Sequence, residues 1–411
     1  MSSSVLGSIT LGYRPFWNRS RALAGLQLFV HEDRQRVDGK HLLRTLEETW
    51  SASAPLLMLS VQTPTLLTEL VTHAERDGPL LEVPLDWLSS GLLRTAVSVA
   101  RKRGVRMIGS SAPGRLLDAE SQGWFERRMT MLSAADAATA MQAVLRAKQD
   151  AVPGRVSMKG RIDGSPLQPD TLVEGVASRA LAEHALDQQG AWAVAGWPIE
   201  DVLHGQAGEP MPPTRRGIVQ VMNAIDDEQS LERIEQLVGQ EPTLTYALLL
   251  YLNSPGLGLR SGVSSLRQGF MMIGYQKLSA WLSQQMPTAS EDANLRPVNQ
   301  SMVLRSHLME RIMDAGVEDD LRREIYLCGL FSQLDLVMNE PLRASFARIP
   351  LADRIVAATA SLSGPYAPAL QLATALESPH PASLRALRIK HDVDAEEINR
   401  ALLRTLAAIG S

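Results

Sequence analysis

The chain has 411 residues, of which 45% are hydrophobic and 21% are charged. This length and composition predict two globular domains of ordinary soluble character. The formal net charge of -4 excludes a general electrostatic attraction to nucleic acid or anionic lipid, and the single cysteine, Cys328, excludes an internal disulfide. Neither a secretory signal layout nor an apolar run long enough to span a membrane is present, so we expect a cytoplasmic protein.

The N-terminal half, residues 1–205, alternates short apolar segments with amphipathic helical segments. Residues 63–76 and 87–104 have helical periodicity, and the second segment ends in basic residues and Gly104, as helices commonly do. Strands recurring with helices between them predict an α/β domain with a mainly parallel sheet that closes into a TIM-like barrel. The expected strands are residues 8–16, 23–31, 55–63, 79–85, 105–111 and 191–199.

The chain changes character near residues 204–217, where three prolines and three glycines disfavour both helix and strand. We place a linker at residues 206–216 and an all-helical domain at residues 217–411. Apolar residues at three- and four-residue spacing support this assignment. Glycines 239, 274 and 316 are expected to end helices, and Asp394 is expected to cap the last one.

Residues 246–283 carry a spacing that resembles the HDOD domain. Asn253 and Ser254 match the end of the family's first helix, the segment from Ser264 to Gly274 matches its second, and Trp281 matches a frequent tryptophan. We expect Asn253 to adopt a left-handed conformation and bond nearby backbone. Ser264 or Ser265 is expected to cap the following helix.

Residues 323–338 look like the segment in which HD-type phosphohydrolases place a His-Asp metal dyad. In this chain the dyad falls on Ser332 and Gln333, which cannot replace an imidazole and a carboxylate around a divalent cation. Asp335 matches a position that the EAL–HDOD group often keeps without chemistry. His307 lies near the place of a first histidine ligand, although a structural histidine is the favoured interpretation. The resemblance therefore implies no hydrolysis by this half.

Residues 11–31 are similar to the opening of the EAL domain, the fold of cyclic di-GMP phosphodiesterases. Tyr13, Pro15 and Gly25 match the family pattern, whereas the metal-binding glutamate that names the domain falls on Gln27. An amide in this position removes one ligand charge from a two-metal site.

Further ligand positions of the EAL pattern are also changed. The asparagine position is Ser60, Glu82 is retained, and the second glutamate falls on Leu85. The paired aspartates at the end of a later strand are Ser110 and Ser111. The remaining ligand positions cannot be placed within residues 124–190. We therefore expect no catalysis and no metal in this half either, and a degenerate EAL-like barrel followed by an HDOD bundle.

Other patterns have simpler structural interpretations. The basic clusters at residues 31–36 and 101–106 are expected to be solvated helix ends or turns, and the glycines of residues 256–262 a helix connection. A serine nucleophile at Ser110 or Ser111 would need a base that the sequence does not identify. Cys328 lies on an apolar helical face, which predicts buried packing.

The changed ligand positions predict a non-catalytic protein that acts through other signalling proteins, and the resemblance implies a role in a bacterial pathway related to cyclic di-GMP, motility or biofilm control. One alternative is a cyclic di-GMP receptor that binds without hydrolysis, and another is a residual hydrolase. We expect no cofactor, no nucleic acid partner and no membrane partner. The oligomeric state and the identity of the protein partner stay open.

Overall fold

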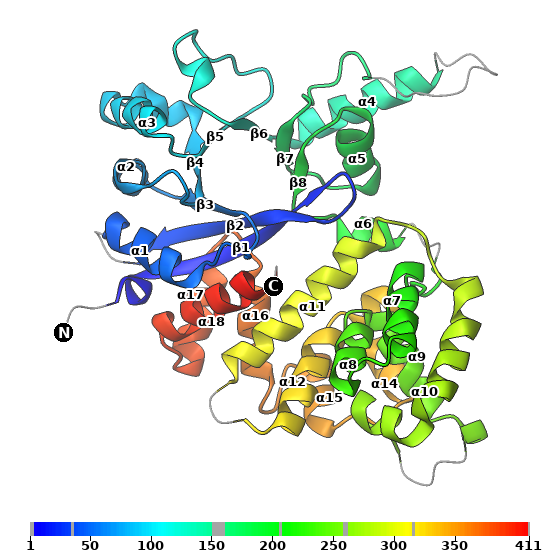
Figure 1. Cartoon of the computed structure of the whole chain (residues 1–411). Helices are drawn as coiled ribbons and strands as arrows, with labels where there is room; N and C mark the ends of the chain where they lie inside the picture. The colour runs from blue at the N-terminus through cyan, green and yellow to red at the C-terminus, as the bar shows by residue number, and fades with distance from the viewer. Residues whose placement is uncertain are drawn as a thin grey trace. The chain divides into compact units, whose positions relative to one another are not determined.

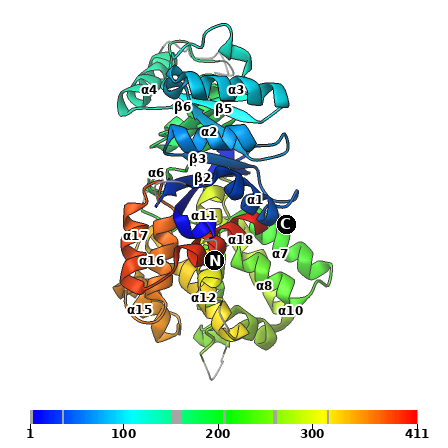
Figure 2. The same cartoon turned by 90° about the vertical axis from the view of Figure 1, so that its left-hand side faces the viewer.

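The computed structural model describes residues 4–33, 37–149, 161–204, 208–257, 262–314 and 317–409. The chain divides into two compact units. The barrel unit comprises Met1–Pro198 together with Ala375–Ser411, and the helical unit comprises Ile199–Thr374 (Figures 1 and 2).

Eight strands close into a barrel in the order β1 to β8, which confirms the predicted barrel. Strand β1 pairs antiparallel with both β2 and β8, and all other neighbours are parallel. Strands β6 and β7 lie in the region that the sequence pattern did not place, because both are short and β6 begins with two arginines. The strands are β1 (Ile9–Asn18), β2 (Leu23–Glu32), β3 (Leu57–Val61), β4 (Leu80–Pro84), β5 (Met107–Ser111), β6 (Arg127–Met131), β7 (Thr171–Glu174) and β8 (Ala193–Ala195).

The barrel interior is apolar at the level of the strand middles. Buried side chains from seven strands pack there, because alternate residues of each strand point inward. Towards the carboxyl ends of the parallel strands the inward-facing residues become polar, and we name this end of the barrel, which carries Gln27, Ser60, Glu82 and Ser110, the barrel mouth. The apolar layer includes Phe16, Met58, Leu80, Ile108, Met129 and Leu172.

Helices surround the first part of the barrel much as the sequence predicts. The 3₁₀ helix η1 (Val5–Ser8) precedes β1, and Gly104 ends α3 in a left-handed conformation with φ 84°. Between strands lie α1 (Gly39–Thr49), α2 (Pro64–His73), α3 (Gly91–Arg103), α4 (Ala134–Gln149) and α5 (Arg179–Glu183).

The C-terminal helices α17 (Ala382–His391) and α18 (Ala395–Ala408) belong to the barrel unit, whereas the sequence assigned residues 217–411 to the helical domain. The reason is an apolar stripe on α18, formed by buried Ile398, Leu402 and Leu406, which packs against η1 and β1. Both views show α17 and α18 beside the β1–β2 pair (Figures 1 and 2). Asp394 occupies the N-cap of α18 as predicted, but its side chain makes no capping hydrogen bond.

The helical unit begins at Ile199, earlier than the predicted boundary, and the predicted linker contributes to it. Met211 is buried and its backbone NH donates to the carbonyl of Val337 at 2.6 Å. The helices of this unit are α6 (Ile199–His204), α7 (Arg215–Asp226), α8 (Leu231–Gly239), α9 (Pro242–Leu252), α10 (Leu266–Gln285), α11 (Leu295–Ile312), α12 (Asp319–Phe331), α13 (Leu334–Met338), α14 (Leu342–Phe346), α15 (Asp353–Ser361) and most of α16 (Ala367–Leu376).

The predicted helix signals of this unit are largely confirmed. Gly239 ends α8, and the Ser265 hydroxyl caps α10 by accepting the NH of Gln268 at 3.3 Å. Gly274, with φ 70° and ψ 167°, breaks α10 into two segments. Gly316 lies outside the described residues, as does most of the glycine segment 256–262.

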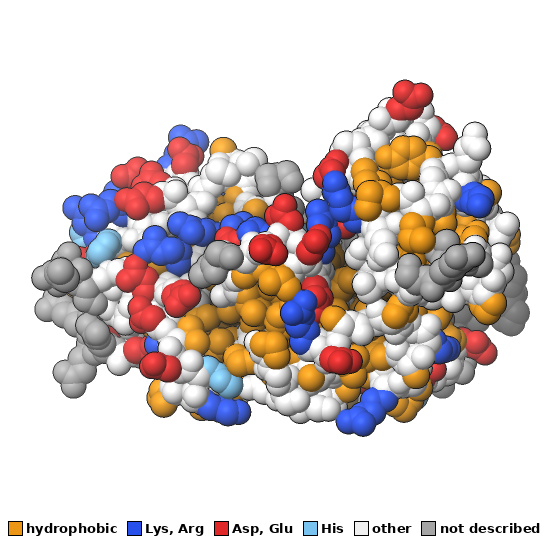
Figure 3. Space-filling view, turned by 90° about the horizontal axis from the view of Figure 1, so that it is seen from below, with side chains coloured by type: hydrophobic (Ala, Val, Ile, Leu, Met, Phe, Trp, Pro, Cys, Tyr) orange, Lys and Arg blue, Asp and Glu red, His pale blue; other side chains and the backbone are white. Residues whose placement is uncertain are grey.

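Helix length and surface charge are relevant to the expected absence of membrane and nucleic acid partners. In the part of the chain that the structure describes, no helix is long and apolar enough to cross a membrane. Figure 3 shows Lys and Arg side chains interspersed with Asp and Glu on the face it draws. That face therefore presents no broad field of one charge for a polyanion.

Candidate functional site at the barrel mouth

Four of the predicted positions meet inside the barrel, each on a different strand. Gln27 on β2 donates through Nε2 to Ser60 Oγ on β3 at 2.9 Å and to Glu82 Oε2 on β4 at 3.4 Å. The Ser60 hydroxyl donates to the same carboxylate oxygen. Ser110 on β5 lies beside this carboxylate. The four positions that were matched to the EAL pattern in the sequence therefore lie in one site.

Glu82 is the chemical centre of this cluster and is only 9% exposed. Burial raises the pKa of its carboxyl above the ordinary value, because the charged form loses its hydration. The hydroxyls of Ser60 and of the neighbouring Ser110 oppose that increase in pKa, the charge of Glu174 adds to it, and the Gln27 amide opposes it. The carboxyl therefore accepts a proton more readily than a surface glutamate does.

Two polar atoms of the cluster are buried without a hydrogen-bond partner. They are Gln27 Oε1 and Ser110 Oγ, whose position beside Glu82 does not give hydrogen-bond geometry. Unsatisfied buried polar atoms are uncommon in folded proteins, and each has an energetic cost of about 1–3 kcal/mol. The mouth therefore has one free acceptor and one free hydroxyl.

The sequence analysis missed an ion pair at the mouth. Arg14 on β1 contacts Glu174 at the end of β7 with a distance of 2.5 Å between Nη1 and Oε1, and both side chains are less than a quarter exposed. The Arg14 guanidinium also lies over the Phe29 ring, 5.1 Å from its centre. Arg14 is the direct cross-strand neighbour of Gln27. One signal for Glu174 was available, since it ends a short apolar strand and precedes Gly175, whose φ is 84°.

Two other predicted positions do not join the mouth. Ser111 follows Ser110 on β5 and therefore points to the opposite face, where its Oγ accepts a 3.3 Å bond from Arg128. Leu85 is buried after the end of β4 and lies against the backbone of Gly109. Of the two serines, only Ser110 can contribute to a site inside the barrel.

In the helical unit, the two predicted dyad positions, Ser332 and Gln333, lie at helix ends. Ser332 follows α12, where its hydroxyl donates to the Gly329 carbonyl at 2.7 Å and accepts from Arg305 at 3.1 Å. Gln333 is the N-cap residue of α13. His307 lies two residues after Arg305 on α11 and so faces elsewhere, with its ring against Tyr326 and its Nδ1 3.0 Å from Glu310. The structure does not bring these polar positions together.

Asn253 has a structural role that differs from the prediction in one respect. Its backbone has φ -97° and ψ 7°, so the expected left-handed conformation is wrong. Its side-chain amide instead joins the helix end to the following loop. Nδ2 donates to the carbonyls of Leu249 and Val263 at 2.7 and 2.9 Å, and Oδ1 accepts the NH of Val263 at 2.8 Å. Because the side chain makes the turn contacts, no positive φ is required.

The remaining family-motif residues make packing contacts or backbone hydrogen bonds, or lie in a helix turn. Trp281 is buried and stacks on Tyr251, with ring centres 5.6 Å apart. Tyr13 is buried on β1, and the Pro15 carbonyl accepts the NH of Gly196 at 2.8 Å. The other two positions are Ser254, whose NH donates to the Tyr251 carbonyl at 3.0 Å, and Asp335 in the first turn of α13.

The structure agrees with the simpler interpretations of Cys328 and of the basic cluster at residues 101–106. Cys328 is completely buried, and burial raises the pKa of its thiol to about 12, so it packs in the core as predicted. In the basic cluster at residues 101–106, Arg101 Nε donates to the Gly123 carbonyl at 2.7 Å and Arg106 pairs with Glu126 at 3.2 Å. These arginines serve local structure at a helix end.

Comparison with known proteins identifies a known domain in the helical half. The HDOD domain model matches residues 210–351. This chain carries an HDOD domain. The cyclic di-GMP phosphodiesterase CdgJ of Vibrio cholerae is 25% identical over 173 residues, which are 42% of this chain and 40% of CdgJ. The uncharacterized protein YuxH of Bacillus subtilis is 22% identical over 163 residues, which are 39% of this chain and 40% of YuxH.

Solved structures similar to this chain include EAL proteins. The BlrP1 protein of Klebsiella pneumoniae, in a manganese and cyclic di-GMP complex, matches with 13% identity and a TM-score of 0.31, covering 46% of this chain and 55% of that chain. The EAL enzyme Bd1971 in its cGMP-bound form matches with 11% identity and a TM-score of 0.28, covering 46% and 60%.

Proposed function

We propose that this chain is a non-catalytic signalling protein that acts through protein partners, in a pathway related to cyclic di-GMP, motility or biofilm control. The observation that carries the proposal is the arrangement at the barrel mouth. Both of its carboxylates are engaged by the protein itself: Glu82 by Gln27 and Ser60, and Glu174 by Arg14.

Two-metal hydrolysis requires several carboxylates that balance the cations and hold a reactive water. The positions beside Glu82 are occupied by the neutral side chains of Gln27, Ser60 and Ser110. Arg14 supplies a positive charge directly against Glu174. Within the described ranges, no group of three or more His, Cys, Asp or Glu side chains could hold a metal ion. This donor set does not fit two divalent cations.

The helical unit supports the part of the proposal that concerns protein partners. Met271, Met272 and Tyr275 are 66%, 41% and 40% exposed around the break in α10 at Gly274. Exposed apolar side chains close together are characteristic of surfaces that other proteins cover, and methionine adapts to varied partners. A protein that signals by contact needs a surface of this kind.

A second candidate function is a cyclic di-GMP receptor that binds without hydrolysis. The free Gln27 Oε1 and Ser110 Oγ favour it, because a ligand with hydrogen-bonding groups in the mouth would satisfy both atoms. The Arg14 guanidinium offers charge for a phosphate if its pairing with Glu174 loosens.

Incubation of the purified full chain with cyclic di-GMP and Mn²⁺ or Mg²⁺ tests the first proposal, with an active phosphodiesterase as positive control. We expect no linear dinucleotide, and clear conversion would contradict the proposal. Calorimetry with the same dinucleotide separates the two candidates. Saturable heat that disappears in Arg14→Ala would favour the receptor, and its absence favours action through proteins alone.

A further inference from the structure

Three side chains of the barrel unit form a chain of hydrogen bonds outside the mouth. Ser165 Oγ lies 2.9 Å from Nε2 of His184, and Nδ1 of the same ring lies 2.6 Å from the amide oxygen of Gln188. Ser165 precedes the amino end of β7, whereas Glu174 of the mouth ends that strand. A hydroxyl, an imidazole and an acceptor in this order are the groups that activate a serine nucleophile.

The local backbone brings His184 and Gln188 together. The segment His184–Gln188 forms a π-helical turn, η4, directly after α5, and the NH of Gln189 donates to the His184 carbonyl at 2.9 Å. Side chains four residues apart on a helix lie on the same side. Leu186 within the turn is completely buried, so core packing holds η4 in place. Such turns are rare and occur frequently at functional positions.

The partner of Nδ1 decides which ring nitrogen of His184 carries the proton. The Gln188 amide oxygen can only accept, so Nδ1–H donates to it. Nε2 is then an acceptor, and the Ser165 hydroxyl donates to it. His184 is 1% exposed, and burial lowers the pKa of its imidazole, an effect that the Gln188 hydrogen bond opposes. The ring is therefore neutral near neutral pH and can take the serine proton.

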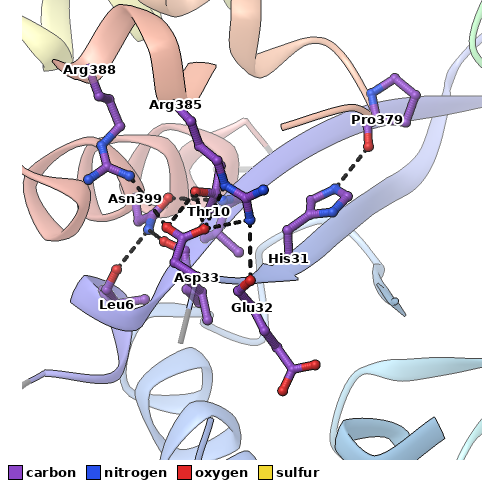
Figure 4. Close-up of polar contacts among 11 residues, drawn as sticks. Leu6, Thr10, His31, Glu32, Asp33, Pro379, Arg385, Arg388 and Asn399 are labelled. Carbon is purple, nitrogen blue, oxygen red and sulfur yellow. Dashed lines mark hydrogen bonds and ion pairs between the residues drawn. The ribbon is translucent and has the colours of Figure 1, made fainter. Parts of the chain in front are cut away.

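A second buried histidine of the barrel unit, His31, has a different proton arrangement. Its Nε2 lies 2.8 Å from the carbonyl oxygen of Pro379, so this nitrogen donates and cannot act as a base (Figure 4). The buried Thr10 hydroxyl in the same view donates to the Asp33 carboxylate. Burial lowers the pKa of His31 as well. The hydroxyl partner, and not burial alone, therefore distinguishes His184.

Ser165 lies where a small reagent can approach it. The side chain is half-buried, and the preceding Asp163 and Gly164 are exposed. Gly164 has φ 78°, and a Cβ placed on it would meet no atom of the described residues within 4 Å. The serine is therefore accessible from the side of Gly164, while its base is shielded from water.

The residue after Ser165 restricts the chemistry. In many serine hydrolases the backbone NH after the nucleophile stabilises the oxyanion, but Pro166 has no NH. An acyl donor must therefore bring a good leaving group, such as phosphate or a phenolate. Peptide bonds and unactivated esters do not meet this requirement. The resulting acyl-serine is itself an unactivated ester, so we expect it to persist.

We propose that Ser165 is a site of covalent acylation by activated acyl donors, such as acyl phosphates. Ser165 Oγ attacks the carbonyl carbon while its proton moves to Nε2 of His184. The bond from that carbon to the leaving oxygen breaks, the leaving group takes the bonding electron pair, and His184 then releases the proton to solvent. This modification goes beyond the proposed function, because it occurs once per chain and involves no cyclic di-GMP.

Incubation of the full chain with p-nitrophenyl acetate, an activated acyl donor, tests the proposal. We expect a burst of p-nitrophenolate equal to one acetyl group per chain, and peptide mapping by mass spectrometry should locate that group on Ser165. Ser133 is the internal control, since it is exposed and its hydroxyl donates to the Asp136 carboxylate at 2.6 Å. Its acetylation should be slower by a factor on the order of 100, which is the usual contribution of a general base.

Substitutions around the imidazole separate activation from a structural role. Ser165→Ala should abolish the burst, and Gln188→Met should slow it by roughly tenfold or more, because the ring loses its fixed orientation. Gln188→Glu keeps an acceptor at Nδ1 and should retain the burst. In the wild type the burst rate should rise with pH around a midpoint below 6.5, the ordinary histidine value. Gln188→Glu should raise that midpoint, because a carboxylate stabilises the imidazolium.

Three results would overturn the proposal, with the fold of each variant checked by circular dichroism. They are equal acetylation rates at Ser165 and Ser133, an unchanged burst in Ser165→Ala, and an unchanged pH midpoint in Gln188→Glu. The last result does not depend on whether Gln188→Met folds.

Discussion

The two halves of this chain differ in whether the motif positions singled out in the sequence come together. At the barrel mouth, side chains from four strands converge: Gln27, Ser60 and Glu82 are joined by hydrogen bonds, and Ser110 lies beside Glu82. In the helical unit, Ser332 and His307 belong to separate local contacts on different helices. The barrel brings its motif positions into one polar site, whereas the helical unit leaves them in separate contacts.

Strand geometry explains this difference. A closed barrel points alternate side chains to one axis whatever their identity, so changed residues continue to meet. A helix bundle brings side chains together only when their positions around each helix agree. If this chain binds a small molecule, the barrel is therefore the unit that we expect to hold it.

The largest predicted effect tests whether the C-terminal helices belong to the barrel half. Leu402→Ala on α18 should lower the free energy of unfolding by about 2–5 kcal/mol, because a completely buried leucine leaves a cavity. Denaturant unfolding measures the loss, and faster hydrogen exchange in β1 and β2 locates it. Ile389→Ala, at an 83% exposed position on α17, is the control and should change stability by less than about 0.5 kcal/mol. Loss of protection confined to the helical unit would contradict the assignment.

A second prediction compares two carboxyls with raised pKa values, Glu241 in the helical unit and Glu82 in the barrel unit. Glu241 in the helical unit accepts bonds from Thr214 and Asn299, and burial raises its pKa from the ordinary value to about 7. Between pH 4.5 and 7 the folded state then binds more protons than the unfolded state. The free energy of unfolding should fall with rising pH, by at most about 1.4 kcal/mol per pH unit, and the contribution is lost above pH 7.

Thermal unfolding of the wild type and of Glu241→Gln across this pH range checks the effect. The variant should lose the slope that Glu241 contributes. Glu82→Gln tests the corresponding direction in the barrel, where burial also raises the pKa. An identical slope in wild type and Glu241→Gln would remove the proposed pH dependence of the helical unit.

A smaller effect is expected from the ion pair at the mouth. Arg14→Ala leaves Glu174 without its partner and should destabilise the barrel by about 1–3 kcal/mol, since both groups are mostly shielded from water. The double variant Arg14→Ala with Glu174→Gln removes the uncompensated charge and should recover part of the loss. Chemical denaturation of the three proteins gives the comparison, and an additive double variant would show that the pair is not coupled.

The smallest effect concerns the helical positions. Ser332→Ala removes one hydroxyl from a helix end and should cost less than about 1.5 kcal/mol. Ser60→Ala in the barrel is the matched change, and it deprives the buried Glu82 of a hydrogen-bond donor. We expect Ser60→Ala to lower the free energy of unfolding more than Ser332→Ala does. Equal losses would contradict the proposed difference between the two halves.

The sequence located most of the barrel mouth because its motif positions lie on strands that are clearly apolar. It did not find Arg14 or Glu174. Arg14 stands between two matched motif residues and was not weighed separately, while Glu174 ends a strand of four residues in a stretch without a clear pattern. Their pairing joins positions 160 residues apart, which spacing along the chain cannot indicate.

The domain boundaries were also difficult to predict from local sequence signals. A proline- and glycine-rich segment suggests a linker, yet Met211 within it is buried in the helical unit. The final helices look like any amphipathic helices, and the apolar stripe of α18 packs against η1 and β1, which lie at the other end of the chain. Local signals predicted the elements, and long-range contacts decided their partners.

We propose that the barrel mouth holds a polar site and does not hydrolyse cyclic di-GMP. The most direct measurement is the rate of cyclic di-GMP conversion by the purified full chain in Mn²⁺, compared with Glu82→Gln and with Mn²⁺ alone. The account predicts that all three samples show the same background rate. Conversion by the wild type well above the metal control, abolished by Glu82→Gln, would contradict it.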